Sequence, residues 1–367
     1  MARSAALQLL RDAQRASPSA RAILAAIPNA LPESILRTLN PSTLELLAPH
    51  GVLAAIAPSA LSSTVLETKS KAMLRQWAAL GALRAEQNRR SWTLALDALD
   101  RAGVPVVPLK GRSLAIRLYG NPAMRVSGDV DVLVSDSKYE AARDALIAAG
   151  FQAPDNVEER FYRREHHHVV LAAPSGMPPI ELHFKLSSAI GQAIPADELL
   201  ARSRVEDVGG KRVRVLSPED EFVYLCVHAA VQAFTPLQLL VDLKLLAKQT
   251  IDWERALQRA REWHVEVSFA TALELTRHWT GLAAPAIGDV SWSHRLRARA
   301  SVAIFADALL LGGVFGKQKR WTAWFTTPAL IDESSEAAEK LSQNLIRVAK
   351  RSAHRRWPAA VPDDWRG

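Results

Sequence analysis

Residues 128–134 read Gly-Asp-Val-Asp-Val-Leu-Val, a run of β-branched and aliphatic residues interrupted by two carboxylates two positions apart. In an extended strand, successive side chains point to opposite faces of the sheet. Asp129 and Asp131 therefore share one face, about 7 Å apart along the chain, and the three valines share the other. The pattern predicts a strand with one face in a core and one face carrying charge.

Two carboxylates at this spacing repel each other, and burying either one without a partner costs free energy. Water, arginine or a divalent metal ion relieves that repulsion, and hard oxygen ligands favour Mg²⁺ or Mn²⁺. An isolated Asp-x-Asp pair is more often an exposed strand end or a turn. The flanking segments therefore decide between a metal site and a solvated edge.

Upstream, a short apolar segment at residues 104–109 is followed by Lys110-Gly111-Arg112-Ser113 and by apolar residues at helical spacing. This order predicts a glycine turn that opens a helix. Such a turn lets the backbone approach a phosphate and directs helix N-terminal N–H groups towards it, and Lys110 or Arg112 adds positive charge. The alternative is an ordinary strand-to-helix connection with solvated cations.

Downstream, residues 179–186 alternate with the period of a half-buried strand and place Glu181, His183 and Lys185 on one face. The segment from Phe161 to Ala173 is predicted to be a second strand, joined to the first by a turn at residues 174–179. If this hairpin lies beside the Asp-x-Asp strand, Glu181 completes a set of three carboxylates. Such a set suits two Mg²⁺ ions about 3.5 to 4 Å apart, whereas the alternative is a solvated ladder of polar side chains.

Taken together, these segments resemble the polymerase-β-like nucleotidyltransferase superfamily. More narrowly, they look like a largely uncharacterised bacterial branch with Leu-Lys-Gly, Arg, Asp-x-Asp and Glu-Leu-His motifs. The resemblance covers roughly residues 65 to 265 and includes a helical half that follows the core. The residues that carry it are Leu109-Lys110-Gly111, Leu118-Tyr119, Arg125, residues 128–134, Glu181-Leu182-His183, His228, Asp242 and residues 251–253.

The resemblance implies an enzyme in which Asp129 and Asp131 hold the ion that carries the triphosphate. Glu181 is then the third carboxylate and helps a second ion to activate the attacking hydroxyl. The implied cofactor is Mg²⁺, or Mn²⁺, and the implied donor is a nucleoside triphosphate, with ATP as one candidate. Positioning and charge neutralisation carry most of such chemistry.

For nucleotide binding, the resemblance points to Lys110, Gly111, Arg112, Ser113 and Arg125. Gly and Ser match a Gly-Ser pair of the superfamily, but here an arginine separates them and a lysine precedes them, which leaves the phosphate contacts open. A guanidinium four residues before the first aspartate can grip a triphosphate oxygen in a bidentate manner. A salt bridge to the two aspartates is the equally acceptable alternative.

The remaining histidines are weaker candidates. His166-His167-His168 invites a zinc hypothesis, but neighbours in a strand point to opposite faces, so only the first and third would share an ion, and no cysteine completes the site. We therefore expect His166 and His168 to face the cleft or solvent. His228 is predicted to be a buried, hydrogen-bonded residue of a helix, although His183, His228 and Asp242 also remain candidates for supporting the nucleotide site.

The chain has 367 residues, and 49% of them are hydrophobic, so it can bury a sizeable core. Its single cysteine, Cys226, excludes a disulfide framework and is expected to be a core residue in a reducing compartment. We find neither a membrane-spanning apolar run nor a convincing signal peptide, and therefore expect a cytoplasmic protein without membrane contact.

The predicted fold class is α+β, a small mixed β-sheet core flanked by N-terminal and C-terminal helical domains. The expected divisions are an N-terminal helical region at 1–60, the core at 61–216, a helical domain at 217–289 and a basic helical region at 290–367. The core begins with one long helix, from Ser62 to Ala102. It closes with a hairpin, residues 205–208 and 213–216, around Gly209-Gly210.

Positive charge gathers at the C-terminal end. From Val290 onward, 13 Lys and Arg face 7 Asp and Glu, which gives +6 of the total net charge of +8. Such a run is usually a solvated helix face or a tail, but with Trp357 beside it the run can also hold RNA through phosphate contacts and stacking. The residues concerned are Arg347, Lys350, Arg351, Arg355 and Arg356.

The sequence thus predicts a metal-dependent nucleotidyltransferase that moves a nucleoside monophosphate to a hydroxyl and releases pyrophosphate. The acceptor is a small molecule or peptide in one version and RNA in another. A non-catalytic nucleotide- or RNA-binding module on the same fold is the alternative, because one scaffold hosts many functions. The presence of all three carboxylates argues for the enzyme.

Overall fold

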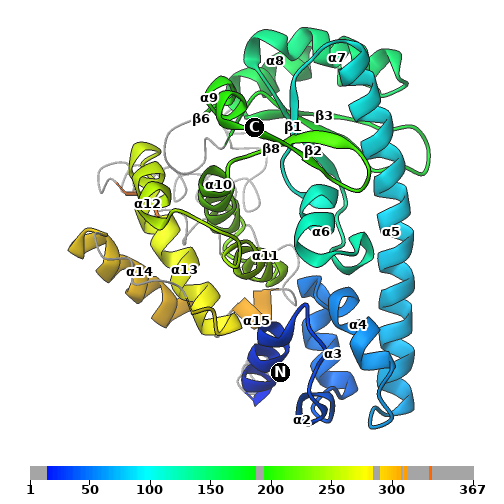
Figure 1. Ribbon diagram of the computed structural model, residues 1–367, viewed down its shortest axis with the longest axis vertical. Helices are drawn as coiled ribbons and strands as arrows, with labels where there is room; N and C mark the ends of the chain where they lie inside the picture. The colour runs from blue at the N-terminus through cyan, green and yellow to red at the C-terminus, as the bar shows by residue number, and fades with distance from the viewer. Residues whose placement is uncertain (1–14, 187–193, 284–289, 307–308, 313–329, 333–367) are drawn as a thin grey trace, which may run out of the picture.

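The centre of the molecule is a small mixed sheet of four strands in the order β1-β2-β4-β3 (Figure 1). β1 (Val106–Pro108) is antiparallel to β2 (Val130–Val134), β2 is parallel to β4 (Ile180–His183), and β4 is antiparallel to β3 (His168–Leu171). The α+β class is confirmed. The computed structural model describes residues 15–186, 194–283, 290–306, 309–312 and 330–332.

The two faces of β2 belong to two different cores. Val130, Val132 and Val134 pack with apolar residues of α5 (Thr68–Arg101) and α7 (Tyr139–Ala148). Leu133, on the opposite face, belongs to the core shared with α6 (Gly111–Tyr119) and the C-terminal helices. Asp131 lies on this second face, so strand alternation directs its carboxylate towards the helical half of the molecule.

The N-terminal region is helical, as predicted. Residues 15–26 form a helix. The predicted long helix starts later than expected, since α5 begins at Thr68, and it runs from the N-terminal helices to the sheet (Figure 1). Gly81 lets α5 approach η2 (Pro122–Met124), where a Cβ would clash with the Ala123 carbonyl oxygen. The shorter elements before α5 are α2 (Glu33–Leu36), α3 (Pro41–Leu47), η1 (Ala48–His50) and α4 (Leu53–Leu61).

The strand predicted from Phe161 to Ala173 is wrong in its first half. After β2 the chain forms η3 (Asp136–Lys138) and α7, and then α8 (Asn156–Glu165), before β3 begins. Tyr139 on α7 donates a hydrogen bond to Glu159 of α8, and the Arg163 guanidinium lies 4.1 Å from the Tyr139 ring centroid. These contacts, with charged residues at most other positions, stabilise a surface helix where a local reading of the aromatic pair suggested a strand.

The strand predicted over residues 179–186 is interrupted. β4 ends at His183, and β5 (Lys185–Leu186) pairs instead with β6 (Ile194–Pro195) in a separate two-stranded sheet. Lys185 therefore leaves the face of Glu181 and lines another cavity with Arg160 and Arg163. At the break, Phe184 is buried against Tyr139.

The second predicted hairpin is confirmed. β7 (Arg204–Asp207) and β8 (Arg212–Val215) are antiparallel, and α9 (Ala196–Arg202) precedes them. Gly209 and Gly210 both have positive φ, at 65° and 83°. Two consecutive left-handed residues match the turn that joins twisted antiparallel strands tightly.

Helices make up the described part of the chain beyond β8. Ser217 caps α10 by accepting a hydrogen bond from the Asp220 amide at 3.2 Å, and Cys226 is buried inside that helix. Among the described residues, no helix combines the length and the apolar character needed to cross a bilayer. The basic residues from Arg347 to Arg356 lie outside the described residues. The helices are α10 (Pro218–Val231), α11 (Gln238–Leu246), α12 (Trp253–Glu262), α13 (Glu266–Thr280), α14 (Trp292–Phe305) and α15 (Leu309–Gly312).

Candidate active site

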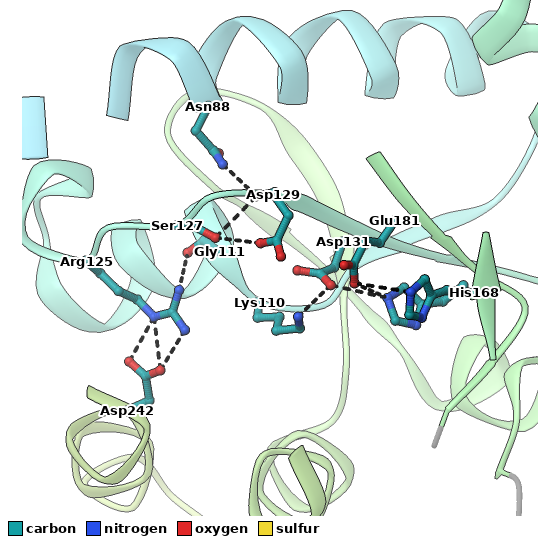
Figure 2. Close-up of polar contacts among 11 residues, drawn as sticks. Asn88, Lys110, Gly111, Arg125, Ser127, Asp129, Asp131, His168, Glu181 and Asp242 are labelled. Carbon is teal, nitrogen blue, oxygen red and sulfur yellow. Dashed lines mark hydrogen bonds and ion pairs between the residues drawn. The ribbon is translucent and has the colours of Figure 1, made fainter. Parts of the chain in front are cut away.

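Three carboxylates meet where β2 and β4 lie side by side. Asp131 and Glu181 are partners in the parallel register of these strands, and Asp129 precedes β2 by one residue. Figure 2 shows the three in a row. The Asp131 side chain is fully buried, whereas Glu181 is 23% exposed. The fold thus brings together carboxylates separated by 50 residues of sequence.

Lys110 neutralises the buried aspartate. Its Nζ lies 2.6 Å from Asp131 Oδ1 (Figure 2), and the residue stands at the N-cap of α6, immediately before Gly111. Burial alone would raise the pKa of Asp131, but the Lys110 ammonium and the hydrogen bond from His183 hold it well below its usual range. In turn, Asp131 raises the pKa of Lys110 against the effect of burial. Both groups are charged at neutral pH.

His183 lies against the same carboxylates. Its Nε2 is 3.2 Å from Asp131 Oδ1 and 3.5 Å from Glu181 Oε2. Burial opposes protonation, but these two contacts raise the pKa of His183. Burial, with the Asp131 carboxylate nearby, raises the pKa of Glu181. Protonation of His183 and protonation of Glu181 are therefore linked through these contacts.

The loop that carries Asp129 is fastened to α5. Asn88 Nδ2 donates a hydrogen bond of 2.8 Å to the Asp129 carbonyl (Figure 2). Ser91 Oγ, on the same helix, donates one of 2.8 Å to the Pro178 carbonyl, just before β4. Ser127 Oγ donates to Asp129 Oδ1 at 2.9 Å. Sequence reasoning missed these supports. Polar residues inside a long helix were the only signal for two of them.

Arg125 is held by Asp242. Its guanidinium donates to both carboxylate oxygens at 2.7 to 3.0 Å, and Tyr119 donates to Asp242 Oδ1 at 2.8 Å. Arg125 Nη1 also donates to the Gly111 carbonyl at 3.4 Å. The alternative considered for Arg125, a salt bridge to Asp129 and Asp131, is replaced by this ion pair with Asp242. Asp242 thereby ties α11 to the loop before β2.

These elements enclose a cavity of about 360 Å³, within the size range of small-molecule sites. Tyr224, Gln232 and Gln238, from the C-terminal helices, also line it and were not predicted. Asp131 is not among the lining residues because it is buried beneath them. The predicted site residues that line the cavity are Lys110, Arg125, Asp129, Glu181, His183 and His228.

Other predicted residues lie elsewhere. Ser113 is fully buried, and Arg112 points to a separate small hollow, where its guanidinium donates to the Ala85 carbonyl at 3.4 Å. Gly111 has φ +55°, and a Cβ there would lie 3.4 Å from Ser127 Oγ, so glycine suits the turn. His228, predicted to be buried in a helix, lies at the cavity wall, where the residue as a whole is half-buried. Burial of its ring lowers the pKa of His228 well below its ordinary value.

The three consecutive histidines depart from the expected pattern. We predicted that His166 and His168 share a face, but β3 begins only at His168, so strand alternation does not apply to the preceding two. His167 and His168 both line the cavity, whereas His166 packs against Phe161 and Tyr162. Burial and the neighbouring His183 lower the pKa of His167 to about 3 and that of His168 to about 4.

The donor set fits a divalent cation. Asp131 Oδ2 is buried and has no hydrogen-bond partner among the described residues, and ligand atoms of Asp131, Glu181 and His183 all lie within 4.8 Å of one another. A buried carboxylate oxygen without a partner is costly unless something binds it. Asp129 completes the oxygen donors on the cavity side.

The comparisons with known proteins agree with this geometry. A family model described as an uncharacterised nucleotidyltransferase matches residues 37–281. The chain belongs to this family. The curated proteins yielded no match.

Two solved structures resemble this nucleotidyltransferase. The antibiotic-resistance factor ANT(2'')-Ia shows 14% identity and a TM-score of 0.35, with 52% of this chain and 96% of that chain covered. An antigenic nucleotidyltransferase-like protein from Paracoccidioides brasiliensis shows 16% identity and a TM-score of 0.28, with 50% and 91% covered. Since both TM-scores are below 0.5, the assignment depends on the family match.

Proposed function

We propose that the protein transfers a nucleoside monophosphate from a nucleoside triphosphate to a hydroxyl group and releases pyrophosphate, in a reaction that requires Mg²⁺ or Mn²⁺. The observation that carries the proposal is the pairing of Asp131 with Glu181 beneath a cavity that Asp129 and Lys110 also line. The family match supports nucleotidyl transfer in general.

The residues around the cavity are proposed to have different roles in binding and proton transfer. Asp129, Asp131 and Glu181 would hold the cations, which neutralise the triphosphate charge when bound. Lys110 keeps its proton and lines the cavity, so it offers a fixed positive charge to a phosphate oxygen. Glu181 is partly exposed and its pKa is raised, which suits a group that accepts the proton of the attacking hydroxyl.

Arg125 and His228 are proposed to complete the nucleotide site. Arg125 lines the cavity while Asp242 fixes its orientation, so little rotamer entropy is lost when it contacts a phosphate. His228 is neutral because burial lowers its pKa, and it can therefore accept or donate one hydrogen bond.

The acceptor is proposed to be a small molecule or peptide hydroxyl. The described part of the cavity has the volume of a small-molecule site, which favours that class over a polymer. RNA remains the other candidate acceptor, through the C-terminal basic residues. If RNA is the acceptor, its affinity falls steeply with salt, and removing charge at Arg351, Arg355 and Arg356 reduces that slope.

The test is isothermal titration of each of the four nucleoside triphosphates into the full chain, with Mg²⁺ and with EDTA. An Asp129→Asn, Asp131→Asn double variant is compared with Asp144→Asn, a control that alters an exposed carboxylate on α7. We expect binding that requires both the metal and the two aspartates, with the control unchanged.

Two other outcomes would change the conclusion. If no nucleoside triphosphate binds to the wild-type protein, the proposed function is overturned. If nucleotide binds but no acceptor class yields pyrophosphate, and the double variant keeps its binding, the non-catalytic module becomes the better description.

A further inference from the structure

Three imidazoles converge at one end of the cavity. His168 and His183 are register partners on the antiparallel strands β3 and β4, and the His167 carbonyl accepts a hydrogen bond of 3.2 Å from the Phe184 amide, which fixes the adjoining backbone. Ring centroids lie 4.6 Å apart for His167 and His168, 4.9 Å for His168 and His183, and 5.4 Å for His167 and His183. One nitrogen of each ring lies within 4.8 Å of the others.

Packing alone leaves this cluster unexplained, because two of its nitrogens are buried and have no partner among the described residues. These are Nδ1 of His168 and Nδ1 of His183, and the His183 side chain is only 3% exposed. A buried imidazole nitrogen without a hydrogen bond is unfavourable unless it binds a ligand. The convergence of three rings suggests a common ligand.

A carboxylate stands beside the rings. Glu181 Oε2 lies 3.5 Å from His183 Nε2 and 4.0 Å from His168 Nε2, as Figure 2 shows for Glu181 and His168. Imidazole suits Zn²⁺ and other first-row transition ions, whereas Mg²⁺ prefers oxygen ligands. Each imidazole binds an ion through one nitrogen, so an ion held by the unpartnered Nδ1 atoms would take three imidazole ligands and keep an open fourth position, while Glu181 stays beside the Nε2 atoms.

We propose that His167, His168 and His183, with Glu181 beside them, form a binding site for a divalent transition-metal ion of the Zn²⁺ or Co²⁺ type. This site is distinct in its chemistry from the oxygen donors Asp129 and Asp131. The proposal deepens the proposed function. It rests on that function only where the ion is given a part in turnover. The ion would occupy the end of the cavity that His167 and His168 line.

The chain offers a matched control in its own sequence. His166 is adjacent to the cluster but packs against Phe161 and Tyr162, outside the group of converging nitrogens. Loss of His166 removes the same chemical group and leaves the proposed site intact. Comparing it with His168 therefore separates binding at the cluster from nonspecific binding by surface histidines.

The experiment titrates Co²⁺ and then Zn²⁺ into tag-free protein, without nucleotide, and follows both binding heat and the visible absorption of bound Co²⁺. We expect one ion per chain. Affinity should fall by at least tenfold in His167→Gln and in His168→Gln, because each loses one ligand. It should stay unchanged in His166→Gln. Thermal melts identify any variant that fails to fold. If His167→Gln or His168→Gln fails to fold, His168→Asn replaces it.

The inference is overturned if the wild type binds no stoichiometric Co²⁺ or Zn²⁺, or if His166→Gln weakens binding as much as His168→Gln. Its failure is distinguishable from failure of the proposed function. Mg²⁺-dependent nucleotide binding without any Co²⁺ site keeps the function and removes this inference. If the protein binds no nucleotide but keeps a Co²⁺ site that survives in Asp129→Asn, the inference stands and the proposed function is removed.

Discussion

Two buried aspartates, each bonded to a basic residue that lines the cavity, are treated differently by the fold. Asp242, on the helical side, has both oxygens bonded, to Arg125 and to Tyr119. Asp131, on the sheet side, is bonded through Oδ1 only, and its Oδ2 has no partner among the described residues. Their side chains are equally inaccessible, at 1% and 0% exposed. A carboxylate with both oxygens hydrogen-bonded stabilises the fold, whereas a carboxylate with one unbonded oxygen is available for a ligand.

The largest expected effect concerns Asp131. Asp131→Asn removes a metal-binding charge, so we expect turnover, measured as pyrophosphate release, to fall on the order of 10³-fold, equivalent to about 4 kcal/mol in the barrier. Stability should change less than in Asp242→Asn, because Lys110 lines the cavity and the charges of Asp129 and Glu181 still favour its protonated form. Asp144→Asn is the control. A loss of stability as large as that of Asp242→Asn would contradict the comparison.

Asp242→Asn should have the opposite profile. Removing one partner of a buried ion pair leaves the Arg125 guanidinium uncompensated, and the expected loss is about 3 to 5 kcal/mol of unfolding free energy. Guanidinium denaturation measures it. The double variant Asp242→Asn, Arg125→Met should lose less than the sum of the single variants. Additive losses would show that the two groups do not act as a pair.

A smaller effect is expected at the support for Asp129. Asn88→Ala removes one neutral hydrogen bond to the Asp129 carbonyl, which also accepts from Ser127 Oγ, so unfolding free energy should fall by about 1 kcal/mol. Mg²⁺ affinity, measured by titration, should fall as well because the loop loses its anchor. Gln87→Ala, at the neighbouring position of α5, is the control. Unchanged Mg²⁺ affinity in Asn88→Ala would remove the positioning role.

The smallest effect is a pH dependence on the sheet side. Burial opposes protonation of His183, but contacts with Asp131 and Glu181 raise its pKa above the ordinary value. A raised pKa adds stability that is fully present below the unfolded pKa of about 6.5 and is lost as pH rises through the folded pKa. The stability difference between wild type and His183→Gln should therefore shrink with rising pH.

Denaturant unfolding between pH 6 and pH 9 measures that difference. The charged and titratable groups nearest the ring come from β2, β3, β4 and the turn before α6, and they enter the comparison equally in both proteins. A difference that grows with pH would contradict the assigned shift. These groups are Asp131, His168, Glu181 and Lys110.

The sheet side was largely predictable, because it depends on local periodicity. Asp129 and Asp131 share a strand pattern with three valines, and Glu181 alternates with apolar residues. The family resemblance supplied the order of these segments, and the family match confirms the family. The metal and nucleotide roles of these residues stay predictions.

The helical side was much less predictable. The Arg125–Asp242 pair joins residues 117 positions apart, and Asn88 meets Asp129 across 41 positions. No periodicity in a single sequence encodes such distances. The misplaced strand before β3 has a different cause, since residues 156–165 are rich in Glu and Arg, which favour a helix, and contacts of Tyr139 with Glu159 and Arg163 add to that preference.

One helix, α5, contacts the loops before both carboxylate strands. Asn88 and Ser91 are three residues apart, on one face of α5, and each fastens the loop that leads into a different carboxylate strand. The opposite half of the same helix packs, through Gly81, near Ala54 of the N-terminal helices. α5 thus connects the N-terminal helices to the loops before both carboxylate strands. A displacement of α5 at Gly81 would therefore be expected to shift both of these loops at once.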